Sequence, residues 1–126
     1  FEQDMNSKKM SKSIEIVYGL RNFIGNANKF CSNKIFINLK SDSEFTEVII
    51  EDDGEGYSSD VLQKIGEPYL KSMNLSDKKK TGLGLGIFIG KTLLEKNFAS
   101  VNCGNSKTRS GAEVIIRWKN KDLSNL

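Results

Sequence analysis

The sequence predicts an α+β fold, a two-layer sandwich in which about three helices cover one face of a mixed, mostly antiparallel sheet. In some segments apolar residues recur at helical spacing, and in four others they alternate with polar residues. A third observation is the run from Thr81 to Ile87, in which a glycine stands at every second position directly before an apolar segment. With 126 residues, the chain has the length of one domain.

The first helix is expected from about Ser13 to Phe30, after a polar, irregular linker over residues 1–11. Its predicted core-facing residues recur at intervals of three and four: Ile16, Leu20, Phe23, Ala27 and Phe30. Asn22, Asn26 and Lys29 form a second stripe about a quarter turn away. Because asparagine is a poor helix former, this polar stripe favours a helix that faces a cleft. A solvated helix face is the alternative.

Four strands are expected from the alternation of apolar and polar residues, over 34–40, 45–52, 101–104 and 112–119. Ser58-Ser59-Asp60 predicts the start of a short helix that ends near Ile65, before the sole proline at Pro68. A third helix is expected from Leu83 to about Lys96.

An acidic residue ends the second predicted strand on its apolar face. Val48, Ile50 and Asp52 share this face by the period of two, and Gly54 and Gly56 follow directly. Asp52 is therefore a candidate ligand-binding carboxylate, and a simple turn former before glycine is the alternative. The neighbouring Asp53 points to the other side and is expected in solvent.

The glycine-rich run at 81–87 favours a phosphate-binding turn. Glycine permits a close approach of the backbone, and a helix N-terminus offers unpaired N–H groups to an anion. A tight turn with small residues for packing is the alternative. Lys71 and residues 78–80 lie in a polar stretch before it, which predicts a basic lid or, alternatively, a run of solvated lysines.

Composition excludes several functions. A net charge of +3 of mixed sign does not predict a nucleic-acid partner. The chain has no histidine, which excludes histidine within it as base, metal ligand or phosphoacceptor. Its two cysteines, Cys31 and Cys103, match no zinc or redox spacing and are expected as inert thiols. No apolar run reaches the roughly 20 residues of a membrane span. Because it begins at Phe1, we expect a fragment of a longer protein.

The order of these segments resembles the ATP-binding (Bergerat) fold of the GHKL superfamily, which sensor histidine kinases share with type II topoisomerases, a chaperone family and mismatch-repair ATPases. Residues 20–30 are similar to the histidine-kinase N box, and 52–56 to the first glycine box. Residues 66–69 resemble the F box, with Tyr69 where phenylalanine is usual, and 81–85 the second glycine box. The resemblance covers Ser13 to Trp118 and is greatest to the redox-responsive RegB/PrrB sensor kinases.

The resemblance implies a site for ATP and Mg²⁺. Asn26 would coordinate the Mg²⁺ with Asn22 in support, Lys29 would reach the phosphates, and Asp52 would accept the adenine amino group. The implied ATP-binding residues are Asn26, Lys29, Phe30, Asp52, Gly54, Gly56, Tyr69, Lys71, Thr81, Gly82, Leu83, Gly84 and Leu85.

One position implies a kinase more than a hydrolase. ATPases of the superfamily carry a glutamate four residues before the Mg²⁺ asparagine, and here that position is Asn22, whose amide cannot act as a base. By resemblance, Asn22 and Asn26 are the catalytic pair, and the γ-phosphoryl group passes to a histidine on a separate dimerisation hairpin. The alternatives are a nucleotide-gated interaction module and a serine kinase of the same fold, such as an anti-sigma factor.

The resemblance also implies an organisation and partners. Residues 1–11 are expected as a linker or a remnant of the hairpin, 12–119 as the kinase domain and 120–126 as a tail. The expected partners are the chain's own hairpin and a cognate response regulator, with the fragment monomeric and the full-length protein a homodimer. The expected location is a cytoplasmic domain of a membrane-bound sensor kinase. Three positions depart from the family pattern, Lys80, Gly86 and Glu113.

Overall fold

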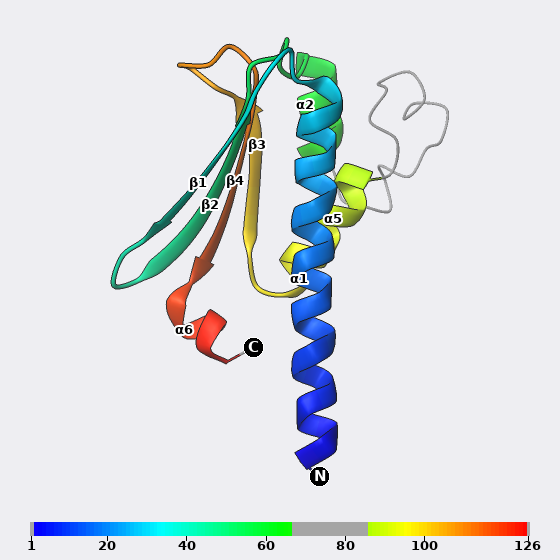
Figure 1. Cartoon of the computed structure of the whole chain (residues 1–126), viewed down its shortest axis with the longest axis vertical. Coiled ribbons are helices and arrows are strands. Elements are labelled where there is room, and N and C mark those ends of the chain that lie inside the picture. Colours follow the sequence, from blue (N-terminus) through cyan, green and yellow to red (C-terminus); the bar gives the residue numbers. More distant parts are fainter. Residues whose placement is uncertain (1, 67–85, 126) are drawn as a thin grey trace.

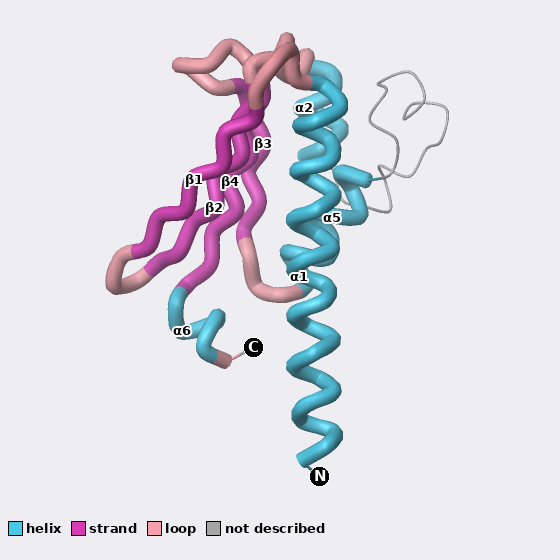
Figure 2. The backbone as a smooth tube through the Cα atoms, viewed as in Figure 1, coloured by secondary structure: helices cyan, strands magenta, loops and turns pink. Residues whose placement is uncertain are grey.

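The computed structural model describes residues 2–66 and 86–125, which form one sheet with helices on one face (Figures 1 and 2). The elements follow in the order α1 (Glu2–Phe30), β1 (Ile35–Ser41), β2 (Phe45–Asp52), α2 (Ser59–Gly66), α5 (Gly86–Lys96), β3 (Ser100–Asn105), β4 (Ala112–Lys119) and α6 (Asn120–Ser124). The predicted two-layer α+β sandwich is confirmed.

The sheet has the strand order β1-β2-β4-β3, and each neighbouring pair in the described residues is antiparallel. We predicted a mixed, mostly antiparallel sheet, and the four described strands contain no parallel pair. β4 follows the other strands in sequence yet lies inside the sheet, where Ile50 of β2 pairs with Val114. The predicted bounds of β2 and β4 are confirmed.

The helical layer rests on a close crossing of α1 and α5. Phe23 of α1, Leu94 of α5 and Ile116 of β4 are among the most deeply buried side chains. A Cβ atom on Gly19 would lie 2.8 Å from Leu94 Cγ, and one on Gly90 would lie 3.0 Å from the Gly19 carbonyl oxygen. The two glycines therefore let the helices approach closely, with the Leu94 side chain packed on Gly19 and the Gly19 carbonyl packed on Gly90.

α1 is longer than predicted. It begins at Glu2 and runs for 29 residues, so residues 2–11 of the expected irregular linker are helical instead (Figure 1). The segment is polar, but it contains no proline or glycine and is rich in lysine, glutamate, glutamine and methionine, which are good helix formers. Helix propensity, and not polarity, decides the local structure here.

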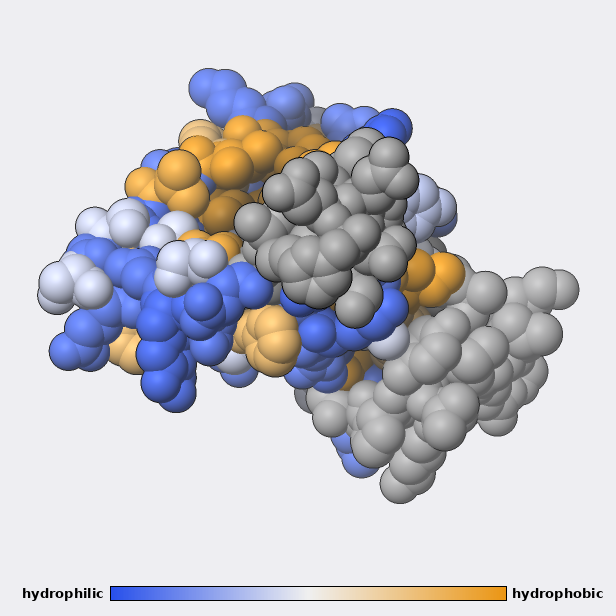
Figure 3. All heavy atoms as spheres, turned by 90° about the horizontal axis from the view of Figure 1, so that it is seen from below, coloured by the Kyte–Doolittle hydropathy of each residue, from blue (hydrophilic) through white to orange (hydrophobic). Residues whose placement is uncertain are grey.

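The apolar face of β1 is covered at one end only. Ile35 packs against the core, whereas Ile37 is 53% exposed and Leu39 is 72% exposed. Toward the β1–β2 turn their strand runs away from the helices (Figure 2). Viewed from the end at which the N-terminus lies, the molecule shows hydrophobic surface between hydrophilic side chains (Figure 3). None of the described helices combines the length and apolar character that crossing a membrane requires.

Candidate functional site

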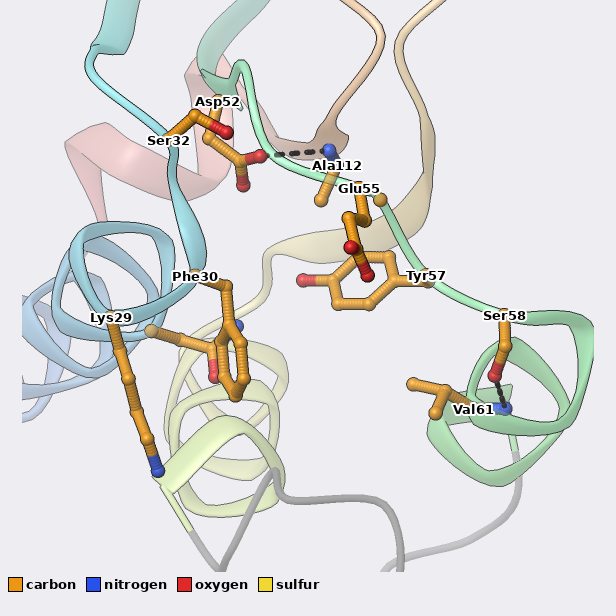
Figure 4. A pocket seen from close by; sticks show the side chains of 11 residues that line it. Lys29, Phe30, Ser32, Asp52, Glu55, Tyr57, Ser58, Val61 and Ala112 are labelled. Atoms are coloured by element: carbon orange, nitrogen blue, oxygen red, sulfur yellow. Dashed lines mark hydrogen bonds between the residues drawn. The ribbon is translucent and has the colours of Figure 1, made fainter.

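A cavity of about 470 Å³ opens between the end of α1, the turn after β2 and the start of α2 (Figure 4). This volume falls in the usual range of small-molecule sites, roughly 300–1,000 Å³. Its lining residues are Asn26, Lys29, Phe30, Ser32, Asp52, Glu55, Gly56, Tyr57, Ser58, Val61 and Ala112. Of the residues predicted from the sequence, the cavity brings together Asn26, Lys29, Phe30, Asp52 and Gly56.

Asp52 is the buried carboxylate of this cavity, with 3% of its surface exposed. Its Oδ1 accepts hydrogen bonds from the backbone N–H of Gly54 at 2.9 Å and of Ala112 at 3.1 Å (Figure 4). The bond to Gly54 is that of a turn former, but burial and the bond to β4 go beyond that role. Within the described residues no hydrogen bond falls on Oδ2, so this oxygen can accept one from a ligand.

Backbone packs directly on backbone around Asp52. A Cβ atom on Gly111 would collide with the backbone and carboxylate of Asp52, and one on Gly54 would collide with the Phe30 carbonyl. The turn after β2, the end of α1 and the start of β4 therefore meet without intervening side chains. This contact holds the Asp52 carboxylate in place.

Tyr57 forms a wall of the cavity and was missed by the sequence analysis. Its ring lies across the cavity from Lys29 and Phe30 (Figure 4). Burial, together with the neighbouring Cys103 and Asp52, raises the pKa of Tyr57 above its ordinary value, so the phenol is neutral at physiological pH. An aromatic residue directly after the second glycine of the turn was the available signal in the sequence.

Asp53, which was expected in solvent, instead organises the turn between α1 and β1. Its Oδ1 accepts hydrogen bonds from the backbone N–H groups of Ser32, Asn33 and Lys34 at 2.9, 3.0 and 3.1 Å. The bonds from Asn33 and Lys34 are the main cause that lowers the pKa of the Asp53 carboxyl below its ordinary value. Asp53 thereby places Ser32 at the edge of the cavity.

Of the polar stripe on α1, Asn26 and Lys29 face the cavity, whereas Asn22 faces the start of α5. Asn26 and Lys29 line the cavity as predicted, and Lys29 Nζ lies 5.3 Å from the ring centroid of Phe30. Phe30, which was expected on the core face, is 42% exposed at the cavity edge. Asn22 is not among the lining residues: its Nδ2 donates to the Tyr18 carbonyl at 2.8 Å, and a Cβ on Gly86 would lie 3.1 Å from its Oδ1.

The remaining sequence predictions concern the short helix, the cysteines, the glycine-rich run and a metal site. The short helix begins as predicted, because Ser58 Oγ accepts the Val61 N–H at 3.3 Å as an N-cap. The two cysteines, expected as buried, inert thiols, are free and only half-buried, and their inertness stays a prediction. Tyr69, Lys71 and the glycine-rich residues Thr81, Gly82, Leu83, Gly84 and Leu85 lie outside the described residues. In the described part of the chain, no group of three or more His, Cys, Asp or Glu side chains could hold a metal ion.

Comparison with known proteins identifies the family of this chain. The family described as histidine kinase-, DNA gyrase B-, and HSP90-like ATPase matches residues 11–122. The sensor histidine kinase RegB of Cereibacter sphaeroides is 34% identical over 119 residues, which cover 82% of this chain and 26% of RegB. The sensor protein RstB of Escherichia coli is 28% identical over 99 residues, 79% of this chain and 23% of RstB. The chain thus spans about a quarter of these relatives' length.

Solved structures show the same fold. The mycobacterial sensor histidine kinase MprB matches with a TM-score of 0.60 at 21% identity, over 81% of this chain and 68% of that one. Full-length ShkA, solved in complex with AMPPNP, matches with a TM-score of 0.62 at 24% identity, over 82% of this chain and 21% of that one. At these identities the likeness is one of fold.

Proposed function

The chain belongs to the family of histidine kinase-, DNA gyrase B- and HSP90-like ATPases, and from this premise we propose that the cavity at Asp52 is its ATP site. In this proposal adenine lies at the Asp52 end and the phosphates lie toward Asn26 and Lys29 of α1. The observation that carries the proposal is the buried Asp52 carboxylate, whose Oδ1 accepts two backbone N–H groups while its Oδ2 accepts no hydrogen bond from the described residues.

The chemistry of Asp52 favours adenine over guanine. Its Oδ2 would accept a hydrogen bond from the adenine amino group, whereas guanine places a carbonyl oxygen at the same position. Two facing acceptors leave a buried polar group unpaired, and such mismatches are strongly discriminated. Phe30, Tyr57 and Val61 supply apolar surface for the base.

The residues present fit a Mg²⁺ ion that is shared with the ligand. Mg²⁺ usually keeps several waters and takes few protein ligands together with phosphate oxygens, which suits a single amide oxygen from Asn26 better than a protein cage. When bound, the ion would neutralise charge on the phosphates. Asn22 faces α5 and would support Asn26 through the helix. Gly54, Tyr69, Lys71 and residues 81–85 remain predicted ATP contacts.

Phosphoryl transfer to another protein is the reaction that this chain supports best. Asn22, whose amide group cannot take a proton from water, occupies the position of the water-activating glutamate in the resembling hydrolases. We therefore assign a histidine kinase domain, which acts by positioning ATP and neutralising charge. The acceptor histidine lies on a dimerisation hairpin outside this chain, which has no histidine.

The larger protein is proposed by analogy with its relatives. Sensor histidine kinases such as RegB match this chain over about a quarter of their length. We propose a homodimeric sensor kinase with this domain on the cytoplasmic side of a membrane, and a cognate response regulator as the next phosphate acceptor. In this proposal residues 12–119 form the catalytic domain.

A phosphotransfer assay tests the proposal. The chain is mixed with Mg-ATP labelled at the γ-phosphate and with the histidine-bearing hairpin of the parent protein, and the phosphoprotein is treated with acid. Acid-labile phosphate on the hairpin is expected, because phosphohistidine hydrolyses in acid. Acid-stable phosphate would identify a serine kinase, release of free phosphate alone a hydrolase, and binding without transfer a nucleotide-gated interaction module.

A further inference from the structure

The side chain of Asn105, at the end of β3, bonds to the backbone of Tyr57 from 48 residues away. Its Nδ2 donates to the Tyr57 carbonyl at 2.9 Å, and its Oδ1 accepts the Tyr57 N–H at 2.6 Å. One amide thus pairs with both backbone groups of a residue outside any strand, in the way a neighbouring strand would. In the described part of the chain, Asn105 is the partner found for these two groups.

The turn that carries Tyr57 is shaped around this amide. Gly56 has φ of +80°, a conformation that side chains with a Cβ rarely adopt. A Cβ on Gly56 would lie 2.6 Å from Asn105 Oδ1. The Asn105 amide therefore occupies the space beside Gly56, and the chain leaves this turn in one direction. That direction points the Tyr57 ring into the cavity (Figure 4).

The same cavity wall is held at its other end by β4. Ala112 donates its N–H to Asp52, and Gly111 packs on the Asp52 backbone. The segment from Asn105 to Ala112 therefore contacts both the carboxylate and the aromatic wall of the cavity. The position of the Tyr57 ring relative to the Asp52 carboxylate decides how a planar base can lie between them.

We infer that Asn105 is a positioning residue for the nucleotide, which fixes Gly56 and Tyr57 as the wall beside the base and thereby sharpens the choice of adenine over guanine. This inference rests on the proposed ATP site. Asn105 touches no reacting atom and acts through Tyr57. Once the wall is loosened, guanine can shift away from the carboxylate that opposes it, so the affinity for adenine nucleotides falls more than that for guanine nucleotides.

Two variants of Asn105 distinguish a role in positioning the nucleotide from a purely structural role. Asn105→Ala removes both hydrogen bonds, and Asn105→Asp keeps the acceptor but sets a carboxylate oxygen against the Tyr57 carbonyl. Asn102→Ala is the matched control, because Asn102 is an exposed asparagine on the same strand. ADP and GDP binding are measured by titration calorimetry for each variant, and thermal melting checks that each is folded.

Both Asn105 variants are expected to narrow the ADP-over-GDP preference about fivefold, as the loss of solvent-accessible hydrogen bonds implies. Asn102→Ala should keep the wild-type ratio. An unchanged ratio in folded Asn105 variants overturns the inference, and so does an equal loss for both nucleotides, which a merely structural role would produce. If Asn105→Ala does not fold, Asn105→Asp decides. A wild-type chain that binds no ADP would instead overturn the proposed ATP site.

Discussion

The two ends of β2 belong to one antiparallel ladder but lie in different surroundings. At the Asp52 end, the strand meets α1, the turn after β2 and the start of β4, backbone against backbone. At the Phe45 end, Arg117 stacks on the Phe45 ring with its guanidinium carbon 3.6 Å from the centroid, and pairs with Glu47 at 3.2 Å. There the neighbouring strand exposes Leu39.

This difference indicates that the Asp52 end of β2, and not the Phe45 end, is built to bind a ligand. At both ends the backbone N–H and C=O groups form hydrogen bonds with neighbouring strands, so strand pairing alone does not make a binding site. The Asp52 end adds a buried hydrogen bond from Ala112, 60 residues away in sequence. At the Phe45 end, the long-range bonds of Asn120 to Thr46 and Asp42 are part-buried or exposed, and the ion pair of Arg117 is of the exposed kind that contributes little to stability. Substitutions at the first end should change nucleotide binding, and substitutions at the second should change stability only.

Asp52→Asn should have the largest effect. The amide keeps an acceptor for Gly54 and Ala112 but presents a donor to the donor of adenine. We expect about a 100-fold loss of ADP affinity, since an unmatched buried pair costs about 3 kcal/mol. GDP, which offers an acceptor, should lose far less. Titration calorimetry with both nucleotides measures this change, and an unchanged ADP affinity would refute the role of Asp52.

Asp53→Asn is the matched control for that variant, with a neighbouring carboxylate on the other face. Because Asp53 acts on the cavity only through Ser32, this variant should lose far less ADP affinity than Asp52→Asn, but it should be less stable at neutral pH. Backbone hydrogen bonds lower the Asp53 pKa in the folded state, so its stabilisation is present above the unfolded pKa of about 3.9 and is lost as the pH falls through the folded value. Urea unfolding at pH 7 and pH 3 should therefore show the stability gap to wild type closing in acid.

Asn26→Ala should have the next largest effect. The variant removes the proposed amide ligand, so the gain in ATP affinity on adding Mg²⁺ should fall about tenfold, or about 1.4 kcal/mol. Affinity measured in EDTA should not change. Asn28→Ala, an exposed asparagine on the same helix, is the control and should keep the full Mg²⁺ effect. Equal behaviour of the two variants would remove Asn26 from the metal site.

Phe98→Gly tests the other end of the molecule. Phe98 follows α5 with φ of 72° and is 57% exposed, and the Ala99 N–H bonds back to the Leu94 carbonyl at 3.0 Å as in a helix C-cap. Glycine relieves the left-handed strain, so we expect a gain of about 1 kcal/mol and a rise of about 4 °C in Tm. Phe98→Ala should give no such gain, and neither should alter ADP binding.

Leu39→Ser should have the smallest effect. With 72% of its surface already exposed, the side chain loses little burial on substitution. We expect a stability change within about 0.5 kcal/mol and unchanged ADP affinity. Chemical denaturation and calorimetry measure both. A clear loss of nucleotide binding would contradict the expectation that only the Asp52 end of β2 affects binding.

Periodicity predicted the parts of the fold that depend on a strand's own sequence. The alternation in Phe45–Asp52 and Ala112–Lys119 predicted both strands with their observed bounds and placed Asp52 on the buried face. It did not predict that Ile37 and Leu39 would be exposed, because alternation distinguishes the two faces of a strand and not how far a helical layer covers one of them.

The candidate site was predictable only in part. Motif order located Asp52, Asn26 and Lys29, which the structure brings to one cavity. The bonds of Asn105 to Tyr57 and of Asp53 to the α1–β1 turn leave no local trace, since each joins a side chain to a backbone far along the sequence. Such bonds depend on how the folded sheet places distant segments side by side, so they cannot be predicted from local sequence.

The place of β4 inside the sheet has a consequence for synthesis and folding. The Asp52 carboxylate gains its second hydrogen bond only after Ala112, 60 residues later, has entered between β2 and β3. A nascent chain that stops before β4 leaves this carboxylate with the Gly54 bond alone, and pairing over such a separation is slow to form. If Asp52 binds the base as proposed, nucleotide affinity would report whether β4 has joined the sheet, and a nucleotide that binds the finished domain would favour it over earlier intermediates.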